Sequence, residues 1–231
     1  MFKEQRGGSL RIYEKPLDQK GYSIGADVSE GLAIGDLSTA CVLDSNKKQV
    51  AQYGGKIHPK DFGKMLCRLG KYYNTAILVP EVNNIGISTI DAIVELGYNQ
   101  IYTREVEEIR GEELQKKIGW QTNKKTKMKA LNEFVANYRD KEVLLYDDRL
   151  LKEMAKVRVE DDGKVILNGK DYVVSVMLAI QGLEQLVIKG QFKASVPGQI
   201  NKPMENKITS MTIEEKLRYY KNKKRSVSSF E

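Results

Sequence analysis

The stretch Gly21-Tyr-Ser-Ile-Gly-Ala-Asp27 decides the fold, because its side chains alternate in the manner of a β-strand. One face of this strand collects the apolar residues Tyr22, Ile24, Ala26 and Val28. Asp27 therefore points to the opposite face, near the carboxyl end of the strand. An acidic residue at that position is placed either for chemistry or for capping a turn.

Two further acidic residues occupy comparable places. Glu81 follows the apolar run Thr75-Ala-Ile-Leu-Val-Pro, and Asp171 opens the helical pattern of residues 171–188. In a mixed α/β sheet such ends meet at one edge. Two-metal hydrolysis of a phosphodiester needs oxygen ligands that hold cations about 3.5 to 4 Å apart. Three acids so placed in a basic protein favour a metal-dependent enzyme that acts on nucleic acid.

Each acid also has a structural interpretation. Asp27 can cap a turn, Glu81 can pair with a lysine, and the helix dipole favours Asp171 whatever its function. Asp36 is a fourth candidate ligand, in a loop whose glycines let the backbone fold toward a metal. A simple turn role for Asp36 is an equal alternative.

The composition predicts one substantial domain in a chain of 231 residues that is 41% apolar and has no run long enough for a membrane span. Cys41 and Cys67 lack partners at metal-ligand spacing, so we expect two buried free thiols, as in a reducing cytoplasm. His58 is the one histidine and precedes a proline at an expected turn. A histidine triad or histidine metal cage is therefore not expected.

The net charge of +7 is unevenly spread. Residues 191–231 hold nine Lys or Arg against four Glu, which leaves about +2 for the rest. A second basic group comprises Lys116, Lys117, Lys124, Lys125, Lys127 and Lys129. By itself it indicates a solvated face. Beside a carboxylate cluster, phosphate contact gains weight, so we expect Lys124, Lys125, Lys127 and Lys129 to bind DNA.

The remaining pattern alternates strands with helices. We expect strands at 10–13, 21–28, 38–43, 50–57, 76–79, 101–102 and 143–146, and a hairpin over 157–167. We expect helices at 59–73, 87–96, 124–138, 150–154 and 171–188, with a further short one possible at 212–220. This order predicts an α/β layer fold with a mixed sheet, in which 76–79 is a central parallel strand. Residues 1–20 are expected to be a lead-in that builds no core, 21–190 the domain, and 191–231 a flexible or partner-ordered tail.

Five stretches together resemble, in order, the C-terminal nuclease domain of the large terminase subunit of tailed bacteriophages. They are Tyr22-Ser-Ile-Gly-Ala-Asp-Val-Ser-Glu-Gly31, Gly35-Asp-Leu-Ser38, Val79-Pro-Glu-Val-Asn-Asn84, Gly119-Trp-Gln-Thr-Asn123 with Thr126-Lys127, and Asp171-Tyr-Val-Val-Ser-Val-Met-Leu-Ala179. The resemblance spans residues 8–188. It implies an RNase H-like fold, with a central mixed β-sheet flanked by helices, that cuts double-stranded concatemeric DNA during genome packaging with Mg²⁺ or Mn²⁺, as two ions.

The resemblance also implies roles for particular residues. Asp27, Glu81 and Asp171 match the metal-binding acids of the family, Asp36 matches an accessory acid, and the hairpin near 161–165 matches an additional β-hairpin beside the active site. Many members carry two adjacent acids where this chain has Gly169-Lys170-Asp171. Lys170 therefore replaces an acid and is a candidate contact to a DNA phosphate.

The implied partners are the terminase ATPase domain, the small terminase subunit and the portal protein, in the bacterial host cytoplasm and transiently at the procapsid, with no membrane. No Gly-x-x-x-x-Gly-Lys-Ser/Thr loop is present, so the chain does not carry that ATPase. Other hypotheses are a related RNase H-like resolvase or transposase, a non-enzymatic DNA-binding or portal-docking module, and an actin-like ATPase fold. An actin-like ATPase would need further phosphate-binding glycine loops, and this sequence does not contain them downstream.

Overall fold

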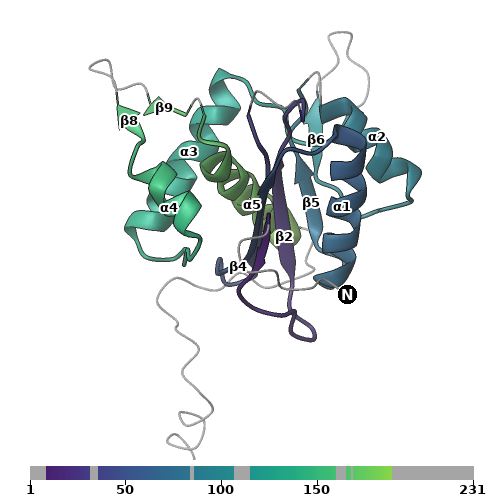
Figure 1. Cartoon of the computed structure of the whole chain (residues 1–231), viewed down its shortest axis with the longest axis horizontal. Helices are drawn as coiled ribbons and strands as arrows, with labels where there is room; N and C mark the ends of the chain where they lie inside the picture. The colour runs from purple at the N-terminus through teal and green to yellow at the C-terminus, as the bar shows by residue number, and fades with distance from the viewer. Residues whose placement is uncertain are drawn as a thin grey trace, which may run out of the picture. The chain divides into compact units, whose positions relative to one another are not determined.

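The alternating strands assemble into a five-stranded sheet in the order β1-β4-β3-β2-β5 (Figure 1). Its members are β1 (Leu10–Ile12), β2 (Tyr22–Asp27), β3 (Ser38–Asp44), β4 (Gln49–Gly55) and β5 (Ile77–Pro80). β5 runs parallel to β2, and the other pairs are antiparallel. The mixed sheet predicted from the sequence is thus confirmed. The computed structural model describes residues 9–31, 36–83, 86–106, 115–159, 165–167 and 169–188, all within the unit Met1–Ala194.

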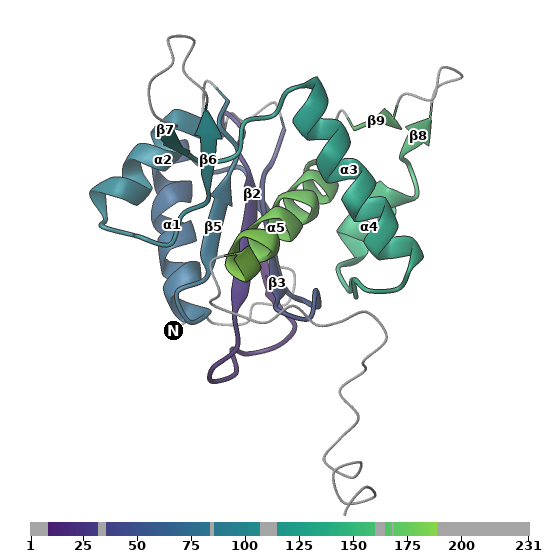
Figure 2. The same cartoon turned by 180° about the vertical axis from the view of Figure 1, so that it is seen from behind.

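Helices cover both faces of the sheet (Figures 1 and 2). One face carries α1 (Pro59–Tyr72), against which α2 (Gly86–Glu95) packs. The other face carries α5 (Asp171–Ile188), which contacts β2, β3 and β5 and is flanked by α3 (Lys124–Arg139) and α4 (Asp148–Met154). Two short hairpins lie outside the sheet: β6 (Thr103–Val106) with β7 (Gln115–Ile118), and β8 (Arg158–Val159) with β9 (Val165–Ile166).

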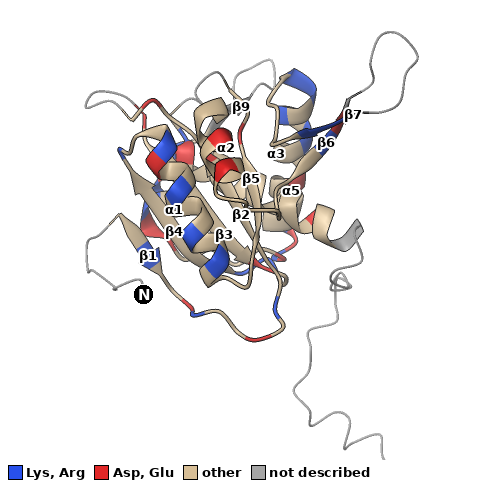
Figure 3. Ribbon diagram, turned by 90° about the vertical axis from the view of Figure 1, so that its right-hand side faces the viewer, with Lys and Arg blue, Asp and Glu red and all other residues tan. Residues whose placement is uncertain are grey.

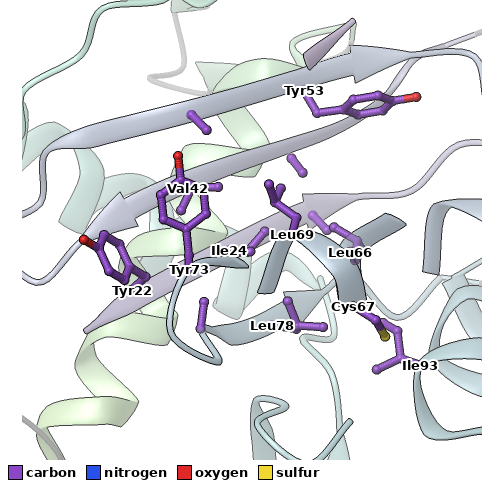
Figure 4. Close-up of a cluster of buried hydrophobic side chains, with 14 of the residues drawn as sticks. Tyr22, Ile24, Val42, Tyr53, Leu66, Cys67, Leu69, Tyr73, Leu78 and Ile93 are labelled. Carbon is purple, nitrogen blue, oxygen red and sulfur yellow. The ribbon is translucent and has the colours of Figure 1, made fainter. Parts of the chain in front are cut away.

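The two faces of β2 behave as its alternation predicts. Its apolar side chains enter the core beneath α1, where Figure 4 shows Ile24 and Tyr22 among Leu66, Leu69 and Tyr73. On the opposite face Gly25 admits the backbone of α5. A Cβ at Gly25 would lie 2.1 Å from the Ser175 carbonyl oxygen and 2.3 Å from the Ala179 nitrogen. The long helix therefore sits directly against the face that carries Asp27.

The segment expected to be a lead-in contains a strand of the main sheet. Leu10, Arg11 and Ile12 pair with β4, and Leu10 and Ile12 pack against the core. The expectation that residues 1–20 build no core is therefore wrong. Three residues are too short a run to reveal by local pattern that they complete a sheet.

β5 is the last strand of the five and not a central one, which corrects the interpretation of its two apolar faces. It is buried on both faces because helices cover both, and its free edge is closed by a parallel bridge between Leu78 and Ile101. An uninterrupted run of apolar residues indicates that both faces of a strand are buried, but it does not indicate whether the strand is central or at the edge of the sheet.

Three local predictions differ from the structure. Residues 143–146 form a single bridge, Leu144 to Lys48, and no strand, because the Gln49 side chain accepts the backbone N–H groups of Tyr146 and Asp147. The β6–β7 hairpin was not expected. In α3 the expected apolar stripe is only partly buried: Leu131 and Phe134 are buried, whereas Met128, Val135 and Tyr138 are exposed.

Other expectations are confirmed. Both cysteines are buried free thiols, and α3 begins at Lys124. The structure further shows that Trp120 is buried and that Asn123 caps α3. His58 precedes α1 and makes no side-chain cap bond. The β8–β9 pairing matches the expected hairpin, although its turn at 161–163 and the tail 191–231 lie outside the described residues. Among the helices that the structure describes, none combines the length and apolarity needed to cross a membrane.

Candidate active site

Asp27 and Glu81 leave the sheet at the same edge because their strands are parallel neighbours. Ala26 of β2 is in register with Pro80 of β5, and each acid follows directly. The Glu81 backbone N–H donates to the Ala26 carbonyl oxygen at 3.0 Å, which extends the pairing by one residue. The parallel register thus places these two acids side by side.

The segments that follow the two strands are tied together. The Asn83 amide donates to the carbonyl oxygen of Val28 at 3.1 Å, which joins the chain after β5 to the chain after β2. Trp120 donates its backbone N–H to Pro80 at 2.9 Å, and its carbonyl oxygen accepts from Val82 at 2.6 Å. Glu81 is therefore held between β2 on one side and the buried Trp120 segment on the other.

Asp171 reaches the same edge from α5. The Thr39 hydroxyl donates to the Asp171 carbonyl oxygen at 2.7 Å, and Thr39 is the cross-strand partner of Asp27. The Leu37 backbone N–H donates to Oδ2 of Asp171 at 3.1 Å and orients its carboxyl group. One residue of β3 thus connects the first turn of α5 to the end of β2.

Asp27 is half-buried, and the other acids at this edge act on its carboxyl group. Burial, followed by the charges of Glu81, Asp171 and Asp36, raises the pKa of Asp27 well above its usual range. Burial also raises the pKa of Asp171, and the hydrogen bond from Leu37 opposes that rise. Burial and the neighbouring acids therefore disfavour the charged form of Asp27 when no cation is bound.

The candidate metal ligands do not form a complete metal site. Across the part of the chain that the structure describes, no three His, Cys, Asp or Glu side chains lie close enough together to hold a metal ion. The structure thus brings Asp27 and Glu81 together, and it places Asp171 at the same edge without joining it to them. Asp36 is exposed, and the preceding residues 32–35 lie outside the described ranges.

Solved structures share this architecture. The large terminase nuclease of thermophilic phage G20c with bound cobalt is 17% identical, with a TM-score of 0.59, covering 77% of this chain and 89% of that one. The chain has the fold of a large terminase nuclease domain. The same G20c nuclease with bound magnesium is 18% identical, with TM-score 0.59 and coverage of 77% and 89%. The nuclease domain of Thermus phage P74-26 is 20% identical, with TM-score 0.55 and coverage of 76% and 86%. No family model and no curated protein matches the sequence.

On this terminase nuclease fold, the expected DNA-binding lysines fall into two groups. Lys124 and Lys125 are exposed in the first turn of α3, Lys127 is half-buried, and basic side chains also mark β6 and β7 (Figure 3). Lys129 is engaged elsewhere: its ammonium group lies 3.4 Å from carboxylate oxygens of Glu133 and Glu184. Lys170 is half-buried directly before Asp171.

Sequence reasoning missed three residues that shape this edge: Thr39, Asn83 and Glu153. Glu153, in the last turn of α4, accepts hydrogen bonds from the backbone of α5 beside Asp171. Burial is the main reason that the pKa of Glu153 is raised to about 7. These residues act across the fold, so no local pattern in the sequence identifies them.

Proposed function

We propose that this chain is a metal-dependent endonuclease that hydrolyses phosphodiester bonds of double-stranded, concatemeric viral DNA during genome packaging. The observation that supports it most is the parallel register that sets Asp27 beside Glu81, with Asp171 at the same sheet edge, on the fold of terminase nucleases. Fold alone does not define activity. The acids at this edge supply the chemical argument.

The donor set fits a divalent cation such as Mg²⁺ or Mn²⁺. All three candidate ligands are carboxylates, the donors that hard cations prefer. Two of them lie side by side, and no ion pair to Asp27, Glu81 or Asp171 occurs among the described residues. A bound cation would offset their mutual repulsion. The G20c nuclease was crystallised with cobalt, magnesium and zinc.

We propose two ions, with Asp27 contacting both and Glu81 and Asp171 each completing one site; Asp36 is an accessory candidate. When bound, the ions activate water and stabilise the leaving oxygen. The protein positions the candidate ligands. Leu37 and Thr39 hold Asp171 through hydrogen bonds. Asn83 and Trp120 hold the segment that carries Glu81.

DNA would be held through its phosphates. The exposed ammonium groups of Lys124 and Lys125, with Lys127, are free of ion pairs in the described part of the chain and suit this role. Lys170 is proposed to contact a phosphate next to Asp171. Lys129 is a weaker candidate than the sequence indicated, because two carboxylates already neutralise it.

The proposed setting follows from the same function. A packaging nuclease would work with a terminase ATPase domain, the small terminase subunit and the portal protein. It would do so in the bacterial cytoplasm and transiently at the procapsid, where its cutting is restrained until packaging demands it.

Supercoiled plasmid incubated with the protein in Mn²⁺, Mg²⁺ or EDTA tests the proposal. We expect nicking and linearisation with either metal and none in EDTA. Asp27→Asn, which keeps the side-chain shape, should lower the rate by at least about 100-fold, the upper range for loss of an outer partner of a metal ligand. Asp148→Asn is the matched control, because Asp148 is an exposed acid in α4.

Equal cutting by the Asp27→Asn variant, or no cutting by the folded wild-type protein under any metal, would overturn the proposal in favour of a DNA-binding or portal-docking module. A strong preference for branched DNA over linear duplex would instead indicate a resolvase.

A further inference from the structure

The helix that carries Asp171 begins without a capping residue of its own. The first intrahelical bond runs from Val174 N–H to the Lys170 carbonyl oxygen, so Lys170 stands at the N-cap position. A lysine side chain has donors only and cannot accept a backbone N–H. The N–H groups at the start of α5 therefore need an acceptor from elsewhere.

Glu153 provides that acceptor from α4. Its Oε2 atom accepts from the backbone N–H of Tyr172 at 2.9 Å and of Val173 at 3.2 Å. These are the second and third residues of α5, the positions that an N-cap side chain normally serves. This places an acceptor oxygen at the positive end of the helix dipole.

α4 is itself anchored, so Glu153 is a fixed acceptor. Asp147 caps α4 by accepting from Arg149 and Leu150, and it also accepts from the Tyr13 hydroxyl at 2.6 Å. The Arg149 guanidinium lies over the Tyr172 ring, 5.0 Å from its centroid. Two contacts, one polar and one stacked, therefore join α4 to the first turn of α5.

We propose that Glu153 is a positioning residue: it holds the first turn of α5 so that Asp171 faces Asp27 and Glu81. The two hydrogen bonds from Tyr172 and Val173 support the capping role of Glu153. Its effect on metal binding and DNA cutting rests on the proposed nuclease function. On the side of the sheet, Asp171 is held by Leu37 through its carboxyl group and by Thr39 through its backbone carbonyl oxygen. On the side of α4, the next two backbone N–H groups of the same turn are held by Glu153. Without the cap, the first turn frays and Asp171 leaves the sheet edge.

The experiment compares the full chain with Glu153→Ala, Glu153→Gln and Glu142→Ala. Glutamine keeps a carbonyl oxygen for both N–H groups. Glu142 is the matched control because it is also half-buried and pairs with a distant residue, Lys47 at 2.6 Å. Circular dichroism in EDTA first establishes that each variant is folded.

Three measurements then follow. Hydrogen exchange at the Tyr172 and Val173 amides, measured by NMR without metal, reports the cap directly. Calorimetric titration with Mn²⁺ reports the site, and plasmid cutting at saturating and limiting Mn²⁺ separates metal affinity from turnover.

We expect Glu153→Ala to expose both amides and to weaken Mn²⁺ binding by about 10-fold to 100-fold, the range found when a group that orients a metal ligand is lost. Much of the cutting should return at saturating Mn²⁺. Glu153→Gln should restore both protection and affinity, and Glu142→Ala should change neither.

Protected amides and unchanged Mn²⁺ affinity in Glu153→Ala would overturn the proposal, as would exposed amides with unchanged affinity. If wild-type protein neither binds Mn²⁺ nor cuts DNA, the proposed nuclease function fails and the positioning role fails with it. Amide exchange then still decides separately whether Glu153 caps α5.

Discussion

The helices α3 and α5 begin in opposite ways. In α3 the Asn123 side chain accepts from Thr126 N–H at 3.0 Å, and the Thr126 hydroxyl accepts from Asn123 N–H at 2.8 Å, a capping box within four residues. In α5 the cap comes from Glu153, which belongs to another helix, α4. A cap from neighbouring residues makes the start of a helix depend on its local sequence alone. A cap from another helix makes the start of α5 depend on tertiary packing, and that start carries Asp171.

The largest effect is expected where α5 docks on the sheet. Gly25→Ala would bring a Cβ to 2.1 Å from the Ser175 carbonyl oxygen, and backbone atoms cannot turn aside. We expect a loss of about 3 kcal/mol or more in the free energy of unfolding, measured with urea, and loss of metal binding. Gly97→Ala is the control. It has nothing within 4 Å but a φ of +65°, so it should cost about 1 kcal/mol and leave metal binding intact. Equal losses in both variants would mean that α5 tolerates displacement from β2.

The acidity of Glu153 gives the second prediction. Burial raises the pKa of Glu153 from 4.5 to about 7; the charge of Asp171 also raises it and that of Lys170 lowers it. The stabilisation from this carboxyl group is fully present below pH 4.5 and is lost as the pH rises through 7. Glu153→Gln stays neutral and keeps the acceptor.

Between about pH 5 and 8, wild-type protein should therefore lose stability relative to Glu153→Gln, by at most about 1.4 kcal/mol per pH unit. Urea unfolding at several pH values measures the difference. Parallel pH curves for the two proteins would contradict the raised pKa.

Removal of the local cap gives the third prediction. Asn123→Ala should lower the free energy of unfolding by about 1 kcal/mol, the usual cost of losing an N-cap side chain. Its Mn²⁺ affinity should match wild type, because α3 carries none of the candidate acids. Calorimetry and urea unfolding report the two quantities. Weakened Mn²⁺ binding in Asn123→Ala would remove the distinction between the two helix starts.

The smallest effect on stability is expected at the exposed lysines. Lys124→Ala with Lys125→Ala should change the free energy of unfolding by less than about 0.5 kcal/mol, since both side chains are exposed. The dependence of log DNA affinity on log salt should become shallower by about two. Lys129→Ala should leave that slope unchanged, because its charge is already paired. Fluorescence anisotropy with duplex DNA at several salt concentrations distinguishes these outcomes.

The sequence predicted those features that depend on residues close together along the chain. The face of Asp27, the full extent of α5 and the start of α3 after Asn123 were predicted, because alternation, helical spacing and a cap each lie within a few residues. The strands β6 and β7 were missed, since Thr-Arg-Glu-Val and Gln-Lys-Lys-Ile are too polar to indicate strands.

Interactions across the fold explain the other failures. The run 143–146 has strand-like residues, but its backbone pairs only at Leu144, and the N–H group of Tyr146 donates to the Gln49 side chain instead of to a strand. Glu153 and Thr39 act on α5 from other elements, at separations that no sequence motif spans. The sequence alone proposed the three acids as candidate ligands and expected them at one edge of the sheet. The register and hydrogen bonds that place them at one edge came only from the structure.

Anomalous scattering from a crystal soaked in Mn²⁺ tests the central claim most directly. We predict a manganese peak in contact with the carboxyl groups of Asp27 and Glu81, with Asp171 turned toward it, and no such peak in Asp27→Asn. A saturated crystal without manganese at this edge, or with the same peak retained in Asp27→Asn, would contradict the assignment of these acids as the metal site.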